Sequence, residues 1–191
     1  AEHSFNVSTF TARTITSSLS DIHGAITGAI ASLKGPLHGG ANEEVMHMMN
    51  KIKKPENALK WINNALSKKE VVMGFGHRVY KSGDSRVPTM EKYFKNVSRI
   101  KSDKKFIKIY NIVKKVMIDK KNIHPNVDYP TGPTYHLMGF DTDFFTPIFV
   151  TSRITGWSAH IMEQHAANKL IRPLSKYSGQ KHRKVMLLNQ R

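Results

Sequence analysis

Apolar residues recur every three or four positions along most of this chain, and glycine- or proline-rich loops interrupt that rhythm. The clearest interruption comes where a helical face that includes Ile30 and Leu33 ends at Gly35-Pro36, because proline prevents the helix from continuing. Further helices are expected at 43–52 and 87–100. No alternation typical of β-strands stands out, so the sequence predicts an all-α fold.

The chain is long enough, at 191 residues, for one domain with a hydrophobic core or for two small ones. Hydrophobic residues make up 39% of it, which is typical of a globular protein, and no apolar run is long enough to span a bilayer. We therefore expect no interaction with the membrane interior. Cysteine is absent, which excludes disulfides, thiolate nucleophiles and cysteine-ligated metals within this sequence.

A formal net charge of +16 calls for a partner rich in negative charge, either nucleic acid or a small molecule with several phosphates. Eight lysines lie between Lys101 and Lys121, interleaved with apolar residues at helical intervals. That pattern is typical of an amphipathic helix with a solvated lysine face. No aromatic ladder, zinc-ligand spacing or RNA-binding signature accompanies it, which argues against a nucleic-acid-binding module.

Three separate loops each present one group that can transfer protons. They are His38, flanked by glycines in the first loop, His77 in a second glycine-rich loop, and Asp128 in a proline-rich loop at 124–133. We expect the prolines to keep this third loop extended, with helical periodicity resuming at Tyr135. Two histidines and a carboxylate suit the abstraction of a proton beside a carbonyl, and Arg86 and Arg153 are suited to clamp carboxylates of a substrate.

Two other patterns do not lead to a site. Gly74-Phe75-Gly76 lacks the third glycine of a dinucleotide-binding fingerprint, and no strand–helix unit surrounds it. His160 and His165 lie five residues apart, which places them on different sides of a helix, unlike the four-residue spacing of helical zinc proteases. We therefore expect no metal site.

The three loops belong to a set of sequence blocks that closely resembles the citrate synthase family. The blocks are Gly35–Asn42, Gly74–Lys81, Asn126–Asp128, Phe145–Arg153, Gly156-Trp157, His160, Glu163-Gln164 and Leu170–Pro173, and their order and spacing match over residues 1–180. The resemblance implies an all-α fold in which residues 1–40 and 140–191 belong to a large helical domain and residues 41–139 form a small one. It also implies that the N-terminal half of the large domain should precede residue 1. Without that half, the chain would expose apolar helix faces.

The family joins the methyl carbon of an acyl-CoA thioester to the ketone of oxaloacetate and then hydrolyses the thioester, so the resemblance implies an acyltransferase. By this resemblance Asp128 removes the proton from the acyl-CoA, His38 donates a hydrogen bond to the thioester oxygen, and His77 polarises the oxaloacetate carbonyl. The implied oxaloacetate ligands are His3, His77, Arg86 and Arg153 of one subunit, with Arg172 supplied by the neighbouring subunit of a homodimer.

Coenzyme A would account for part of the positive charge. The resemblance implies that its adenine lies along the backbone of Val72, Gly74, Phe75 and Gly76, and that its pantetheine chain passes Leu37 and Asn126. Lys120 or Lys121 would reach a phosphate, and the resemblance leaves open which of the two does so. The acyl-CoA is a co-substrate, so no permanently bound cofactor is expected.

The leading hypothesis is a citrate synthase acting on acetyl-CoA, and two alternatives stay open. Tyr129–Pro133 is similar to a subgroup that includes 2-methylcitrate synthases, which take propionyl-CoA, and one methylene is weakly discriminated by an apolar pocket. A catalytically silent relative or a basic nucleic-acid-binding helical module is the alternative from another class. The resemblance implies a cytoplasmic location in a bacterium and the mitochondrial matrix in a eukaryote.

Overall fold

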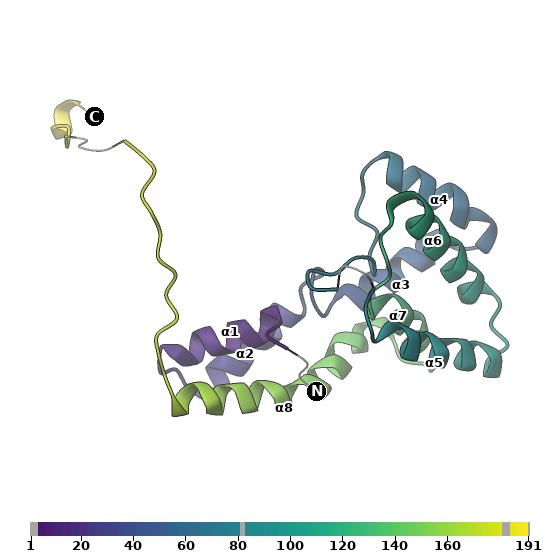
Figure 1. The fold of residues 1–191 in the computed structure, drawn as a ribbon, viewed down its shortest axis with the longest axis horizontal. Helices are drawn as coiled ribbons and strands as arrows, with labels where there is room; N and C mark the ends of the chain where they lie inside the picture. Colours follow the sequence, from purple (N-terminus) through teal and green to yellow (C-terminus); the bar gives the residue numbers. More distant parts are fainter. Residues whose placement is uncertain (1–3, 81–82, 181–183, 191) are drawn as a thin grey trace.

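The regular structure of this chain is helical (Figure 1). The computed structural model describes residues 4–80, 83–180 and 184–190, and within these ranges it contains no β-strand, only an isolated bridge between Phe75 and Pro125. The elements in chain order are α1 (Val7–Ser17), α2 (Ile22–Leu33), α3 (Ala41–Ile52), α4 (Pro55–Ser67), α5 (Val87–Ile100), α6 (Lys105–Lys121), α7 (Asp128–Leu137), the 3-10 helix η1 (Thr142–Phe144), α8 (Phe145–Ala166) and the 3-10 helix η2 (Leu188–Gln190). The all-α prediction is confirmed. None of the helices in these described ranges is long and apolar enough to cross a membrane.

Local signals in the sequence fix several helix ends. The side chain of Asn6 caps α1 by accepting a hydrogen bond from the backbone N–H of Thr9 at 3.0 Å. Asp21 caps α2 in the same way through Gly24, at 2.8 Å. At the C-terminal end of α6, Asn122 adopts a left-handed conformation with φ of 52° and ends the helix. Each of these residue types is favoured at the position it occupies.

The expectation of an extended third loop is wrong, because α7 begins at Asp128 and not near Tyr135. Pro130 is the third residue of α7, in the first turn, where backbone N–H groups have no partner inside the helix and a proline costs little. Pro133 lies inside the helix, and the next residue, Thr134, donates its hydroxyl to the carbonyl of Pro130 at 2.6 Å. Prolines that suggested an extended segment are therefore tolerated within a short helix. Asp128 consequently stands in the first turn of a helix.

Two lobes build the molecule, and each has its own hydrophobic core (Figure 1). The short lobe consists of α3 to α7, and all five helices contribute large apolar side chains to its core. Phe94, Tyr110 and Tyr129 are among its fully buried members. Phe145, the first residue of α8, also packs in this core, beyond the predicted domain boundary at residue 140. The domain boundaries themselves stay a prediction.

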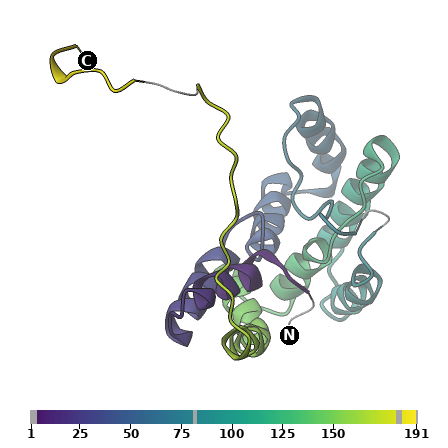
Figure 2. The ribbon, with the colours of Figure 1, turned by 60° about the vertical axis from the view of Figure 1, so that its left-hand side comes forward.

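The long lobe consists of α1, α2 and α8, which lie side by side and extend away from the short lobe (Figures 1 and 2). Its core is thin, and its buried apolar members are Ala12, Ala25, Ala29, Leu33, Trp157 and Ile161. Small side chains let the helices approach closely but bury little apolar area. Larger apolar side chains stay exposed on its surface, among them Phe10, Ile22, Ile30, Ile154 and Met162.

After Ala166 the chain leaves the long lobe as an extended segment that runs away from both lobes (Figure 2). Its first residues are anchored on α1. Asn168 donates its side-chain N–H to the carbonyl of Ser17 at 3.1 Å, and the backbone N–H of Ile171 donates to the Ser17 hydroxyl at 3.0 Å. Residues 172–180 are all exposed.

Two of the links between the lobes help to position the space between them. The first is the turn between α2 and α3, where a Cβ added at Gly39 would lie 2.8 Å from the carbonyl oxygen of Leu33, and one at Gly40 would lie 2.6 Å from that of Lys34. Backbone atoms cannot give way at such distances, so both positions require glycine. The second link is Glu43 of α3, whose carboxylate accepts the N–H of Thr146 at the start of α8, at 2.9 Å.

Candidate active site

A cavity of about 670 Å³ lies between the two lobes and is lined by both of them. The N-terminal segment before α1, the α2–α3 turn, the loop at 71–80, the segment before α7 and part of α8 form its walls. Most of the predicted site residues line it, namely Leu37, His38, Val72, Gly74, Phe75, Gly76, His77, Arg86, Asn126, Asp128 and Arg153. Groups that are far apart in the sequence therefore face one space.

Three of the predicted residues that the structure describes are not among those that line the cavity. Lys120 and Lys121 lie at the C-terminal end of α6, and the ammonium group of Lys120 donates to the side chain of Asn63 at 2.8 Å. Arg172 stands in the exposed segment after α8. His3 lies outside the described residues. The roles suggested for these four residues stay predictions, as do those suggested for the residues that line the cavity.

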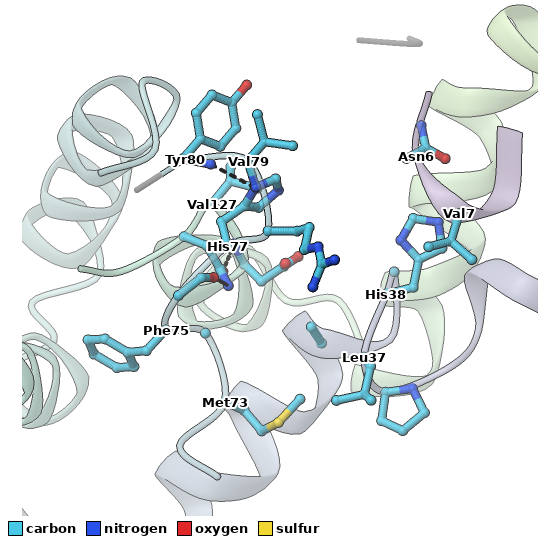
Figure 3. Close-up of a pocket in the computed structure, with 18 of the residues that line it drawn as sticks. Asn6, Val7, Leu37, His38, Met73, Phe75, His77, Val79, Tyr80 and Val127 are labelled. Carbon is cyan, nitrogen blue, oxygen red and sulfur yellow. Dashed lines mark hydrogen bonds between the residues drawn. The ribbon is translucent and has the colours of Figure 1, made fainter. Parts of the chain in front are cut away.

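His38 is held by the start of α1. The backbone N–H of Ser8 lies 3.2 Å from Nε2 of His38, and the Ser8 hydroxyl lies 2.8 Å from the same nitrogen. A backbone N–H can only donate, so Nε2 must accept, and a neutral His38 ring then carries its proton on Nδ1. Figure 3 places His38 beside Asn6 and Val7 on the long-lobe side of the cavity. The ring is thereby prepared to donate a hydrogen bond from Nδ1.

The hydroxyl of Ser8 also connects α1 to α8. Nη1 of Arg153 lies 3.4 Å from it and Nε1 of Trp157 lies 3.3 Å from it, while the hydroxyl donates to the side chain of Asn6 at 2.7 Å. Arg153 is buried, and its guanidinium lies 4.7 Å from the centre of the Phe149 ring. Ser8 therefore fixes a cation and a histidine together. Sequence reasoning missed it, since nothing distinguishes this serine from its neighbours before the fold is known.

His77 faces the cavity from the short lobe, opposite His38 (Figure 3). Its Nδ1 accepts the backbone N–H groups of Val79 and Tyr80, at 3.0 and 3.3 Å. The proton of a neutral ring must then be on Nε2. The two histidines are thus held in opposite tautomers, one presenting Nδ1–H and the other Nε2–H as a donor.

The glycines before His77 let its loop lie against α7. Gly74 and Gly76 have φ of 83° and 77°, values that side chains disfavour. A Cβ at Gly74 would also lie 2.8 Å from Cβ of Tyr129. Asn126 ties the loop to the segment before α7, since its backbone N–H donates to the Gly74 carbonyl and its side chain to the Gly76 carbonyl, both at 2.9 Å.

Asp128 has the acid–base property that proton abstraction requires. Burial raises the pKa of this carboxyl to about 7, against the opposing effect of the nearby Arg86 and Arg153 charges, while Asp84 adds to the increase. A carboxylate with a pKa near neutrality is a stronger base than an ordinary aspartate, and it is half ionised at neutral pH and mostly ionised above it. The cavity therefore combines the carboxylate of Asp128, two imidazole donors and three arginines, which are Arg78, Arg86 and Arg153.

His160, one of the two histidines that could suggest zinc, has other partners. Nδ1 of His160 lies 3.1 Å from Nη1 of Arg13, which also pairs with Glu163. Across the described ranges, no group of three or more histidine, aspartate or glutamate side chains is placed to hold a metal ion.

Comparisons with known proteins show the family of this chain. Residues 1–174 match the family model described as "Citrate synthase, C-terminal domain". The chain belongs to the citrate synthase family. It is 58% identical over 191 residues to "2-methylcitrate synthase 2" of Corynebacterium glutamicum, covering 100% of this chain and 50% of that protein. It is also 58% identical over 186 residues to "Citrate synthase" of Mycolicibacterium smegmatis, covering 97% and 50%.

A solved citrate synthase has the same fold. The enzyme of Thermoplasma acidophilum, described as a ternary complex with carboxymethyl coenzyme A and oxaloacetate, superimposes with a TM-score of 0.88 at 37% identity, over 99% of this chain and 52% of that one. The citrate synthase family resemblance and the helical fold class predicted from the sequence are thereby confirmed. The chain spans about half the length of the curated relatives it matches.

Proposed function

We propose that this chain supplies the catalytic groups of a citrate synthase, which condenses an acyl-CoA with oxaloacetate and then hydrolyses the thioester. The observation that carries the proposal is the convergence of His38, His77 and Asp128 on one cavity, together with Arg86 and Arg153. No permanently bound cofactor is needed, because coenzyme A arrives and leaves with the acyl group.

Asp128 and His38 act on the acyl-CoA. The Asp128 carboxylate removes a proton from the carbon next to the thioester carbonyl, a step that its raised pKa favours. His38 donates from Nδ1 to the thioester oxygen, which lets the enol form without a full negative charge in a water-poor site. Asp128 belongs to the short lobe and His38 to the junction with the long lobe, so the step needs both.

His77 and the arginines act on oxaloacetate. The Nε2–H of His77 polarises the ketone that the enol attacks, and Arg86 and Arg153 hold the two carboxylates through charge-assisted hydrogen bonds. His3 and an Arg172 from a second subunit complete this set. The exposed position of Arg172 after α8 leaves it able to reach a neighbouring molecule.

Coenzyme A follows the loop at 72–76, with Leu37 and Asn126 beside its pantetheine chain and Lys120 or Lys121 near a phosphate. The basic surface supports this role, since the chain carries a formal net charge of +16. Phosphates held by lysines do not require a rigid geometry, so lysines outside the cavity walls are suitable partners.

The active protein is proposed to contain an N-terminal half as well, and to be a homodimer. The relatives are about twice as long as this chain, and the long lobe exposes Phe10, Ile22 and Met162, which a further layer of helices would cover. The relatives from Corynebacterium glutamicum and Mycolicibacterium smegmatis are both bacterial, which favours the cytoplasm over the mitochondrial matrix as the location.

The relatives do not decide whether the acyl group is acetyl or propionyl, because the citrate synthase and the 2-methylcitrate synthase are both 58% identical to this chain. Propionyl-CoA is therefore the second candidate substrate. One methylene in an apolar pocket changes binding by about 1–3 kcal/mol, so use of both substrates is compatible with the site.

The test is a pair of chimeras in which this chain replaces the matching C-terminal half of the C. glutamicum or the M. smegmatis relative. We expect both chimeras to release free CoA thiol from acetyl-CoA or propionyl-CoA only when oxaloacetate is present. An acyl preference that is the same in both hosts belongs to this chain. Folded chimeras that release no thiol would contradict the proposal.

A second measurement tests one of the assigned roles. Arg153→Ala should weaken oxaloacetate binding by about 100-fold in calorimetry, because a buried charge-assisted partner of the substrate is lost. Binding of the acyl-CoA should change much less. Unchanged oxaloacetate affinity would remove Arg153 from the site.

A further inference from the structure

Asp84 is a buried carboxylate that touches two parts of the site at once. It is 4% exposed and lies in the loop before α5, two residues before Arg86. Oδ1 accepts the backbone N–H and the Nε–H of Arg86, at 3.0 and 2.9 Å. Oδ2 accepts from Nη2 of Arg86 at 2.7 Å and from the backbone N–H of Val127 at 3.0 Å. Val127 immediately precedes Asp128, the first residue of α7.

These four contacts require a carboxylate. Each oxygen receives two donors, and one oxygen serves both Arg86 and Val127. An amide of the same shape turns one acceptor into a donor, so an asparagine would face two of the four N–H groups with its own N–H in either orientation. Burial by itself would raise the pKa of Asp84, but the hydrogen bonds from Arg86 outweigh it and hold the pKa below its ordinary value.

We propose that Asp84 is a positioning residue that fixes the Arg86 guanidinium and the Asp128 carboxylate relative to each other. This inference rests on the proposed function, in which Arg86 binds oxaloacetate and Asp128 removes the proton. Through Arg86, Asp84 sets where the first substrate lies. Through Val127, it sets where α7 begins and hence where the base stands. The distance between oxaloacetate and the base is therefore under the control of one side chain outside the substrate contacts.

The charge of Asp84 also acts on Asp128. Charged and titratable groups surround that carboxyl on several elements. They are Arg86 and Asp84 from the loop before α5, Arg153 from α8, Tyr135 from α7, His38 from the α2–α3 turn, and His77, Arg78 and Tyr80 from the loop at 71–80. Asp84 neutralises Arg86 and so limits how strongly Arg86 stabilises an ionised Asp128. Without Asp84, Arg86 has Asp128 as its remaining carboxylate neighbour, and the base becomes weaker.

The experiment compares Asp84→Asn, Asp84→Glu and a matched control in the active chimera. The control is Asp103→Asn, because the carboxylate of Asp103 also accepts backbone N–H groups, those of Lys105 and Phe106 at the start of α6, but does not line the cavity. The readouts are oxaloacetate affinity by calorimetry, the KM for oxaloacetate and for acyl-CoA, and the pH profile of kcat.

We expect Asp84→Asn to raise the KM for oxaloacetate about 100-fold and to move the acidic limb of kcat to lower pH by about 0.5–1 unit. Asp84→Glu keeps the charge but moves the carboxylate, because the side chain is one methylene longer. It should therefore raise the KM for oxaloacetate about tenfold and leave the acidic limb of kcat in place. Asp103→Asn should lower only the melting temperature. A merely structural role of Asp84 would not separate the two Asp84 variants in their pH profiles.

Each result decides the matter. If folded Asp84→Asn keeps the oxaloacetate KM and the acidic limb of the unmodified chimera, Asp84 does not position the site. If Asp84→Asn fails to fold, Asp84→Glu carries the test, and an unchanged oxaloacetate KM in that variant overturns the inference. An unmodified chimera without activity or oxaloacetate binding would overturn the proposed function and this inference together, whereas an active one with unaffected Asp84 variants overturns the inference alone.

Discussion

The short and long lobes bury their apolar residues in different ways. The short-lobe core collects large side chains from five helices, including the fully buried Phe94, Tyr110 and Tyr129. The long-lobe core depends on three alanines and on Leu33, Trp157 and Ile161, while larger apolar residues remain on its surface. Stability grows with buried apolar area, so the core of the short lobe should stabilise that lobe by itself. The exposed apolar residues of the long lobe instead form a surface suited to packing against further polypeptide.

The candidate site combines the two lobes instead of belonging to one. His77, Arg86 and Asp128 come from the short lobe, whereas His38 is held by Ser8 of α1 and Arg153 lies on α8. On the proposed function, the lobe that we propose to be covered by further polypeptide thus supplies part of the chemistry. Because the two lobes differ in this way, loss of packing in the long lobe should lower activity strongly. The same loss should affect the fold of the short lobe much less.

The largest expected effect comes from removing one acid–base group on each side of the cavity. Asp128→Asn and His38→Ala should each lower kcat in the chimera by about 10²–10⁴-fold, with oxaloacetate binding little changed, because both residues are proposed to act on the acyl-CoA. His47→Ala is the control, since His47 is exposed on α3 outside the cavity. A large loss for one variant and none for the other would show that the chemistry does not need both lobes.

The next largest effect is a difference in stability between substitutions in the two hydrophobic cores. Phe94→Ala should lower the free energy of unfolding by about 3–5 kcal/mol, and Leu33→Ala by about 2–3 kcal/mol in the isolated chain, because the thin long-lobe core has fewer large neighbours to lose. The two tryptophans, Trp61 on α4 and Trp157 on α8, report one lobe each during urea unfolding. We expect the Trp157 transition to come first. Coincident transitions in the isolated chain would contradict the independence of the short lobe.

A smaller effect compares helix contacts made through glycine. Gly132→Ala in the short lobe should destabilise by about 1–3 kcal/mol, since the added Cβ would lie 2.7 Å from the carbonyl oxygen of Asn42. Gly28→Ala in the long lobe should be close to neutral. Its Cβ meets the movable end of the Ile15 side chain, and alanine gains about 1 kcal/mol in helix propensity. Chemical denaturation of both variants measures their free energies of unfolding. Equal losses of stability would contradict the expected difference between the lobes.

The smallest effect concerns the pH dependence that the site adds to the short lobe. Burial raises the pKa of Asp128 from 3.8 to about 7, so its ionised form destabilises the folded state, increasingly as pH rises from about 4 to 7 and fully above that. Asp128→Asn should therefore stabilise the chain by about 1–2 kcal/mol more at pH 8 than at pH 5. Urea unfolding followed at Trp61 measures this, and an equal gain at both pH values would speak against a raised pKa.

Some of this structure could be predicted from the sequence, and some could not. The apolar period predicts a helix over 87–100, and α5 spans Val87–Ile100. Gly35-Pro36 predicts the break after Leu33, where α2 ends. The start of α7 is mispredicted because proline fits the first turn of a helix as well as an extended segment. The sequence-family resemblance, not residue spacing, suggested that the three loops would meet.

The sequence by itself determined that the chain is helical and where several helices begin or end, because proline, glycine and capping side chains act on the backbone next to them. Only the tertiary structure decided the partners of the functional groups. Ser8 meets His38 across 30 residues and Asp84 meets Val127 across 43. Such contacts depend on how every helix between them packs, and no local pattern in the sequence carries that information.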